Sequence, residues 1–148
     1  MTGFAATISE WGQSELDRML AIFQTSAEMV YNDMTEPGGR VPRITGNLAR
    51  SAIASDQSMP AIKPGQEDFP DRSGESIGVI HGTTLGATVY IGFQAAYSAR
   101  VNFGFVGTDS LGRVYNQTGR AFIEASQQDW PQTVARAEAV VRGRFERG

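Results

Sequence analysis

Residues 97–125 read YSARVNFGFVGTDSLGRVYNQTGRAFIEA, and the rest of the chain can be understood outward from this stretch. An aromatic and apolar series opens into a glycine-rich polar excursion, residues 105–119, and helical spacing returns after Arg120. The run TDSLG at 108–112 is typical of a tight turn at the tip of the excursion. Nothing in the stretch pairs a nucleophile with a base. It therefore predicts a protruding loop made for contact, and no catalytic site.

The segments on either side of the excursion favour helices. Residues 95–103 fit a short helix or an irregular strand, and we favour a helix that ends at Gly104. From Arg120 onward, apolar residues recur at helical spacing. Asp129 can cap a new helix that has Pro131 in its first turn. Two helices or one kinked helix are both compatible with the pattern, and we favour a break near Asp129 and Trp130.

The N-terminal part of the chain predicts one long α-helix. Between Thr7 and Met34, apolar residues recur every three or four positions, which indicates one buried helix face. Ser9 is the expected N-cap, with the firm helix starting near Gln13, and the sequence EPGG at 36–39 ends it. We interpret the stripe as core, because it does not persist over the several heptads of a coiled coil. Its members are Leu16, Met19, Leu20, Phe23, Ala27, Val30, Tyr31 and Met34.

The next segment, residues 40–55, reads RVPRITGNLARSAIAS and predicts an extended entry followed by a short helix over 46–54, capped by Thr45. Arg40, Arg43 and Arg50 form the densest basic cluster of the N-terminal half, and Arg50 is expected to point outward. The cluster is either a solvated face or a contact for an acidic patch on a neighbouring subunit, since guanidinium groups bind carboxylates well.

Residues 56–75 predict a long loop with three prolines and two glycines. Loops of this length inside a domain are uncommon and tend to be mobile or functional. Phe69 is one of the apolar residues with which the loop could bind a partner. The loop either becomes ordered on assembly or is a passive insert, and both interpretations remain open.

Residues 76–81 and 87–93 predict two antiparallel strands joined by a hairpin turn at 82–86. An isolated hairpin is marginal in water, so these strands require the long helix or further strands against them. His81 is the only histidine and lies at the end of the first strand. With no cysteine and no second histidine to complete a metal site, we interpret His81 as a polar residue beside the turn.

Composition places further bounds on fold and function. A chain of 148 residues accommodates a single domain, 1–148, and the absence of cysteine excludes disulfides and thiolate metal sites. The net charge of −3 offers no cationic footprint for nucleic acid. No apolar run approaches the roughly 20 residues that span a bilayer, so no membrane partner is expected. The predicted fold class is α+β: a long N-terminal helix packed on a small, mainly antiparallel sheet, with a short middle helix and a C-terminal helix, and no cofactor.

Four separated elements together resemble a known family. They are RITGNLARS at 43–51, YIG at 90–92, YSARVNFG at 97–104 and GRAFIEA at 119–125. In this order, between a long N-terminal helix and a C-terminal one, they resemble the neck or tail-completion proteins of long-tailed bacteriophages, the lambda gpZ-like family, over about residues 41–140. The chain differs from the family pattern at Asn102, where an acidic residue is frequent, and at Ala121, where proline is. The first difference removes the charge for a salt bridge between neighbouring subunits.

The resemblance implies a structural virion protein and no enzyme. The expected assembly is a ring of six subunits in the virion neck, formed in the host cytoplasm between the head-side connector or stopper and the tail terminator or tail tube. Genomic DNA passes through its lumen without sequence-specific binding. The alternative is the tail-terminator ring that caps the tail tube. The residues expected to contact subunits or partners are Arg40, Arg43, Arg50, Phe69, Phe105, Leu111, Arg113, Tyr115 and Arg120.

A small hydrolase is the competing class of function. Serine, histidine and aspartate are all present, and residues 74–78 (GESIG) match the bare spacing G-x-S-x-G, but the chain has no H-E-x-x-H and no G-K-[ST] loop. The sequence therefore favours the joining protein.

Overall fold

The computed structural model describes residues 3–147, and its longest element is the helix α1 (Phe4–Thr35). The predicted long helix is thus confirmed, and so is its end, where Glu36 is the C-cap. The predicted cap is wrong: the helix begins earlier, with Gly3 at the N-cap position and no side-chain cap. Among the described residues, no helix is both long and apolar enough to cross a membrane.

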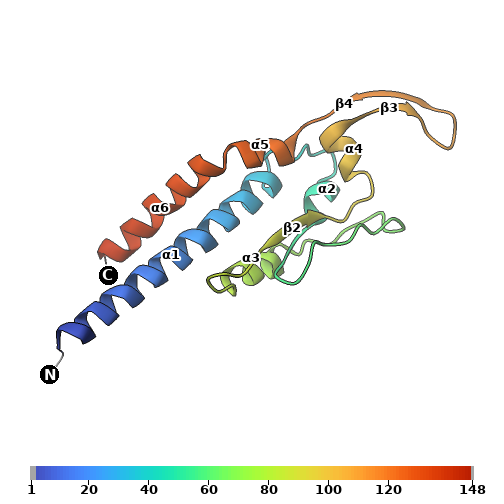
Figure 1. The fold of residues 1–148 in the computed structure, drawn as a ribbon. Helices are drawn as coiled ribbons and strands as arrows, with labels where there is room; N and C mark the ends of the chain where they lie inside the picture. The colour runs from blue at the N-terminus through green and yellow to red at the C-terminus, as the bar shows by residue number, and fades with distance from the viewer. Residues whose placement is uncertain (1–2, 148) are drawn as a thin grey trace.

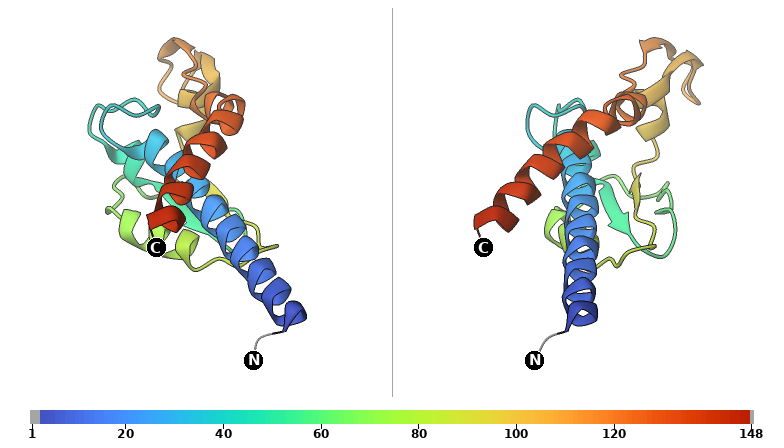
Figure 2. Two further views of the ribbon diagram at one scale, coloured as in Figure 1. Left: turned by 90° about the vertical axis from the view of Figure 1, so that its left-hand side faces the viewer. Right: turned by 60° about the vertical axis from the view of Figure 1, so that its left-hand side comes forward.

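The C-terminal helix α6 (Trp130–Arg147) runs back along α1, so that the two long helices lie side by side (Figures 1 and 2). Thr133, Ala137 and Val141 recur every fourth residue and are the buried residues of α6. The preceding helix α5 (Phe122–Gln128) ends at Asp129, which confirms the predicted break. The first turns of α1 extend beyond the end of α6 and leave large apolar side chains exposed: Phe4, Ile8 and Trp11.

The segment after α1 is only partly helical. Helix α2 (Asn47–Arg50) has four residues, and the chain then enters strand β1 (Ala52–Ser55). The predicted helix over 46–54 is therefore wrong beyond Arg50. Ala52 and Ala54 are buried while the residues between and after them are half-buried, and this alternation is that of a strand with one face in the core.

The predicted hairpin of residues 76–93 is also wrong. Residues 76–81 belong to helix α3 (Ser73–His81), in which Ser76 and Ile80 face the core four residues apart. Strand β2 (Tyr90–Phe93) does form, but it pairs antiparallel with β1, from Ala52↔Phe93 to Ser55↔Tyr90. The pairing partner lies about forty residues upstream and not in the adjacent segment.

The core lies between α1, α3 and the β1–β2 sheet, and α5 closes one end of it (Figure 1). Phe93 and Phe122 meet edge to face, with ring centroids 5.0 Å apart. These contacts confirm the α+β class, with the long helix on a small antiparallel sheet. Other buried members are Tyr31, Met34, Leu48, Ala49 and Ile80.

The predicted long loop is observed from residue 56 to residue 72, after which α3 begins. Helix α4 (Ser98–Phe103) is confirmed and ends at Gly104. The excursion 105–119, predicted as a loop, is instead a β-hairpin of β3 (Gly104–Thr108) and β4 (Val114–Thr118), with only residues 109–113 as its turn. It projects from the body next to α4 (Figures 1 and 2).

Candidate interaction site at the base of the hairpin

Three of the segments that carry the family resemblance meet around one hollow of about 370 Å³. Thr45 and Gly46 contribute from the start of α2, Tyr97 from the N-cap position of α4, and Arg120 from the residue after the hairpin. These residues are up to 75 positions apart in the sequence. The fold thus gathers the elements into one site at the base of the projecting hairpin.

The buried side chain of Asn47 ties this site together. Its Nδ2 donates to the Glu67 carbonyl at 2.8 Å and to the Tyr97 hydroxyl at 3.0 Å, while its Oδ1 accepts from the Phe69 N–H at 2.8 Å. One amide therefore joins α2, the 56–72 loop and α4. Because Asn47 is only 6% exposed, replacing any of these bonds with water would require opening the site.

Asn102 is a second buried hub, at the other end of α4. Its Nδ2 lies 3.0 Å from both carboxylate oxygens of Glu124, and its Oδ1 accepts from the Ile123 N–H at 3.0 Å. The position where the family often has an acid is thus occupied here by an amide bound within its own chain.

The segments that flank the hairpin, the end of α4 and residues 119–121, approach each other closely at its base. The Arg120 N–H donates to the Val101 carbonyl at 2.8 Å, and the Ala121 N–H to the Asn102 carbonyl at 2.9 Å. A Cβ on Gly119 would lie 2.5 Å from the carbonyl carbon of Phe103, so no larger residue fits. These contacts fix the hairpin to α4 and to the start of α5.

The hairpin turn is built around Asp109. Its carboxylate accepts from the N–H groups of Leu111 and Arg113 at 2.9 Å, from Arg113 Nε at 2.6 Å and from the Tyr115 hydroxyl at 3.3 Å. Desolvation alone would raise the pKa of Asp109, but the hydrogen bonds from Arg113, Leu111 and Tyr115 outweigh it and hold the pKa below 3.8. The turn is therefore preformed.

The hairpin has one covered and one open face. On the covered face, the Arg100 guanidinium lies 4.1 Å from the centroid of the Phe105 ring, and Tyr115 lies 6.0 Å from that ring. On the other face Val106 and Val114 are 78% and 81% exposed, and Leu111 at the tip is 76% exposed. Because the hairpin projects from the body, no other element of the chain packs on this exposed hydrophobic surface. Such a surface is typical of an interaction site.

The three arginines of the predicted basic cluster in the N-terminal half divide into two groups. Arg43 and Arg50 both lie near Gly46, and Arg40 is apart from them in an ion pair with Asp129. Arg43 donates to the Thr35 carbonyl at 2.9 Å. Arg50 does not point outward as predicted: its Nε donates to the Phe69 carbonyl at 2.8 Å and its Nη1 to the Thr45 carbonyl at 3.1 Å.

Phe69 is corrected in role. Its side chain is 5% exposed and belongs to the core, because Asn47 and Arg50 hold its backbone against α2. It therefore anchors the 56–72 loop to its own chain, and its buried side chain offers no surface for the predicted partner contact. Leu111 and Arg120 remain exposed, whereas Phe105 and Tyr115 are partly covered within the hairpin.

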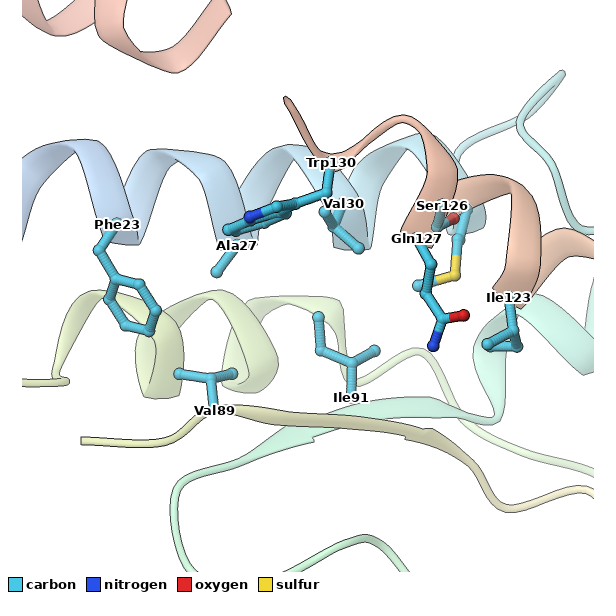
Figure 3. Close-up of a pocket in the computed structure, with 10 residues that line it drawn as sticks. Phe23, Ala27, Val30, Val89, Ile91, Ile123, Ser126, Gln127 and Trp130 are labelled. Atoms are coloured by element: carbon cyan, nitrogen blue, oxygen red, sulfur yellow. The ribbon is translucent and has the colours of Figure 1, made fainter. Parts of the chain in front are cut away.

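The structure contains an apolar groove of about 450 Å³ that no pattern in the sequence predicts. It opens between α1, the approach to β2, and α5, and Figure 3 shows its side chains pointing into a common space. None of the lining residues is charged. The spacing of the apolar stripe on α1 predicts core along its whole length, but no element covers this part of the stripe, which leaves it open. The lining includes Phe23, Val30, Val89, Ile91, Ile123 and Trp130.

The polar groups of the described chain offer little for catalysis. His81 Nε2 lies 2.5 Å from a carboxylate oxygen of Glu28 at the surface, with its position set by the end of α3. Within residues 3–147, no three histidine, cysteine or acidic side chains gather as a metal site.

No family model, curated protein or solved structure that was compared with the chain matches it.

Proposed function

We propose that the protein is a structural component of a bacteriophage neck, a ring of six copies that joins the DNA-filled head connector or stopper to the tail. The observation that carries this proposal is the meeting of three resembling segments at the base of a preformed, projecting hairpin. A joining protein needs such a projecting contact element on a rigid body. In this proposal the chain catalyses no reaction, and the alternative station is the terminator ring on the tail tube.

The proposed lumen allows DNA to pass without holding it. The chain carries a net charge of −3, and strong binding to the phosphate backbone requires many basic contacts. We expect the purified protein to bind no duplex DNA at physiological salt in a mobility-shift assay. Salt-dependent retention with a steep slope would contradict this part of the proposal.

The decisive experiment removes the chain from assembling particles. Without it, heads and tails are expected to accumulate separately, as seen by electron microscopy, and adding the purified protein should restore joined virions. Virions that assemble with heads and tails still joined in its absence would refute the proposal.

A deletion tests the hairpin within this function. Removing residues 108–113 shortens the projecting end while leaving α4, α5 and the core in place. The variant should fold, with an unchanged far-ultraviolet circular dichroism spectrum from its helices, and fail to join heads to tails. Normal joining by the variant would show that the hairpin is not a contact element.

A further inference from the structure

We propose that strand β4 of one copy pairs with the free edge of β2 in a second copy, and that Val106 and Val114 thereby fill the apolar groove beside that edge. The inference deepens the proposed function and rests on it for its biological setting. It predicts a contact between two different surfaces of identical chains.

The two edges of the β1–β2 sheet are not equivalent. At the outer edge of β1, the Ala52 carbonyl accepts from the Tyr31 hydroxyl at 3.1 Å, and the Ala54 N–H donates to Ser76 Oγ at 3.1 Å. This edge is closed by side chains. Within residues 3–147 no strand pairs with the other edge, that of β2.

The open edge presents backbone groups for pairing. In an antiparallel pair, residues opposite each other turn their N–H and C=O groups either both inward or both outward. Since Ala54 uses its N–H on the outer side of β1, its register partner Ile91 turns its backbone groups to the outer side of β2. An unpaired strand edge of this kind is a template for another strand.

The groove lies beside this edge. Ile91 and Ile123 line both the hollow of about 450 Å³ and an adjoining one of about 270 Å³, so the apolar surface continues from Phe23 to Phe103. α1 passes over this space, and Figure 3 shows Phe23 and Val30 directed toward Val89 and Ile91 across it. A strand added next to β2 would have one face against these side chains.

The hairpin has the matching properties. Four of the five β4 residues are exposed, and Val114 lies diagonally opposite Val106 on the open face. That face carries no charged residue, as the groove lining carries none: its residues are Gly104, Val106, Thr108, Val114, Asn116 and Thr118. A two-stranded sheet is marginal alone, and joining the two pairs would give a four-stranded sheet covered by α1.

Charges around the two surfaces are complementary. Residues 98–121 hold three arginines and one aspartate, whereas the groove-forming segments 23–34, 89–93 and 122–129 hold four acidic residues and no arginine or lysine. Among the described residues, Arg100 and Arg120 form no ion pair on the hairpin side, and Glu124 forms none on the groove side. The unneutralised charges are thus of opposite sign, which favours this pairing over hairpin against hairpin.

The contact is heterologous, because donor and acceptor are different surfaces. Each copy offers one hairpin and one groove, and such contacts repeat from copy to copy until the rotation closes a ring. This is the geometry that the proposed neck ring requires.

Disulfide trapping tests the contact directly, since the natural chain has no cysteine. Val114→Cys places a thiol on the open hairpin face and Gln127→Cys places one at the groove. Mixing the two single variants under mild oxidation should give a covalent heterodimer in at least about tenfold excess over either homodimer, and the double variant should give a ladder of higher oligomers.

Gln117→Cys is the matched control, because Gln117 is exposed on the opposite face of the same strand. Mixed with Gln127→Cys, it should trap at least about tenfold less. A dominant Val114→Cys homodimer, equal trapping by the control or no intermolecular disulfide at all would overturn the proposed contact.

A charge substitution provides a second measurement. Val114→Glu should weaken self-association of the full chain at least about tenfold in analytical ultracentrifugation, while Val140→Glu on the exposed side of α6 should not. Unchanged association of Val114→Glu would refute the contact. If the trap forms but heads and tails join without the protein, the proposed function fails and the contact stands; if joining requires the protein but no trap forms, only the contact fails.

Discussion

At the scale of single residues, two buried asparagines connect segments of the chain that are distant in the sequence. Asn47 and Asn102 each use both ends of the amide, and each connects segments that no strand pairing connects. An amide can donate and accept at the same time, which a carboxylate cannot. This explains why Asn102 is compatible with a partner that is itself an acid, Glu124.

Asn102→Asp should therefore destabilise the fold. The substitution replaces a donor with a second carboxylate oxygen facing Glu124, so that one buried group loses its partner and like charges meet. We expect a loss of about 2–3 kcal/mol in the free energy of unfolding, measured by chemical denaturation. Asn116→Asp, on exposed β4, is the control and should change stability by less than about 0.5 kcal/mol.

Glu124→Gln, added to the Asn102→Asp variant, gives the matching rescue. With an amide at position 124, the carboxylate introduced at position 102 would again face a donor, and most of the lost stability should return. A double variant as unstable as the single one would show that the contact between Asn102 and Glu124 is not the cause.

At the scale of elements, the outcome of sequence-based prediction depended on whether the signal was local. The α1 stripe repeats over many turns, so periodicity alone identified it. α3 has nine residues, and its Ile77 and Val79 alternate by chance while the helical pair Ser76 and Ile80 faces the core. Short segments of this kind fit both periods equally well.

The sheet and the site depended on distant contacts. β1 pairs with β2 across about forty residues, and local patterns cannot specify such a partner. The glycines of the hairpin obscure its strand pattern, so the sequence predicts a loop here, although the turn signal at 108–112 lies within one residue of the observed turn at 109–113. The groove exists because no element packs on one part of the apolar stripe of α1. The sequence of the stripe itself does not show which of its residues another element covers.

The hairpin turn should be sensitive to acid. Its carboxylate at Asp109 has a pKa below 3.8, the ordinary value, so the turn is fully supported above that pH and loses this support as the pH falls through the lowered pKa. Amide chemical shifts of Leu111 and Arg113, followed by NMR between about pH 6 and 2, should move together with one midpoint below that of an unstructured aspartate.

Asp109→Asn is the control for that titration. The amide cannot carry the charge, so the coordinated shift should vanish while resonances of the core remain in place. A midpoint at or above 3.8 in the natural chain would contradict the hydrogen-bonded turn.

At the scale of the whole molecule, α1 is the helix against which α2, α3, α5 and α6 all pack. One side of α1 carries the core with α3 and the sheet, and α6 packs along it (Figure 1). The groove opens between α1, the approach to β2, α5 and the first residue of α6. The shape of the groove therefore depends on how α6 packs against α1.

Overpacking under α6 tests this dependence. Ala137 is fully buried in α6, and Ala137→Leu adds volume where none is free. We expect a loss of about 1–3 kcal/mol in the free energy of unfolding, measured by thermal or chemical denaturation. Ala139→Leu, exposed on the same helix, is the control and should leave stability nearly unchanged.

The closed outer edge of β1 also limits the number of neighbouring copies that one sheet can bind. Tyr31 and Ser76 of the same chain form hydrogen bonds with that edge, so a further strand can be added to the sheet only at the edge of β2. A building block that accepts one strand and donates one hairpin has two connections and cannot branch. The number of copies in a closed assembly then follows from the angle between successive blocks, so a substitution that tilts the hairpin should change the count of subunits without weakening any single joint.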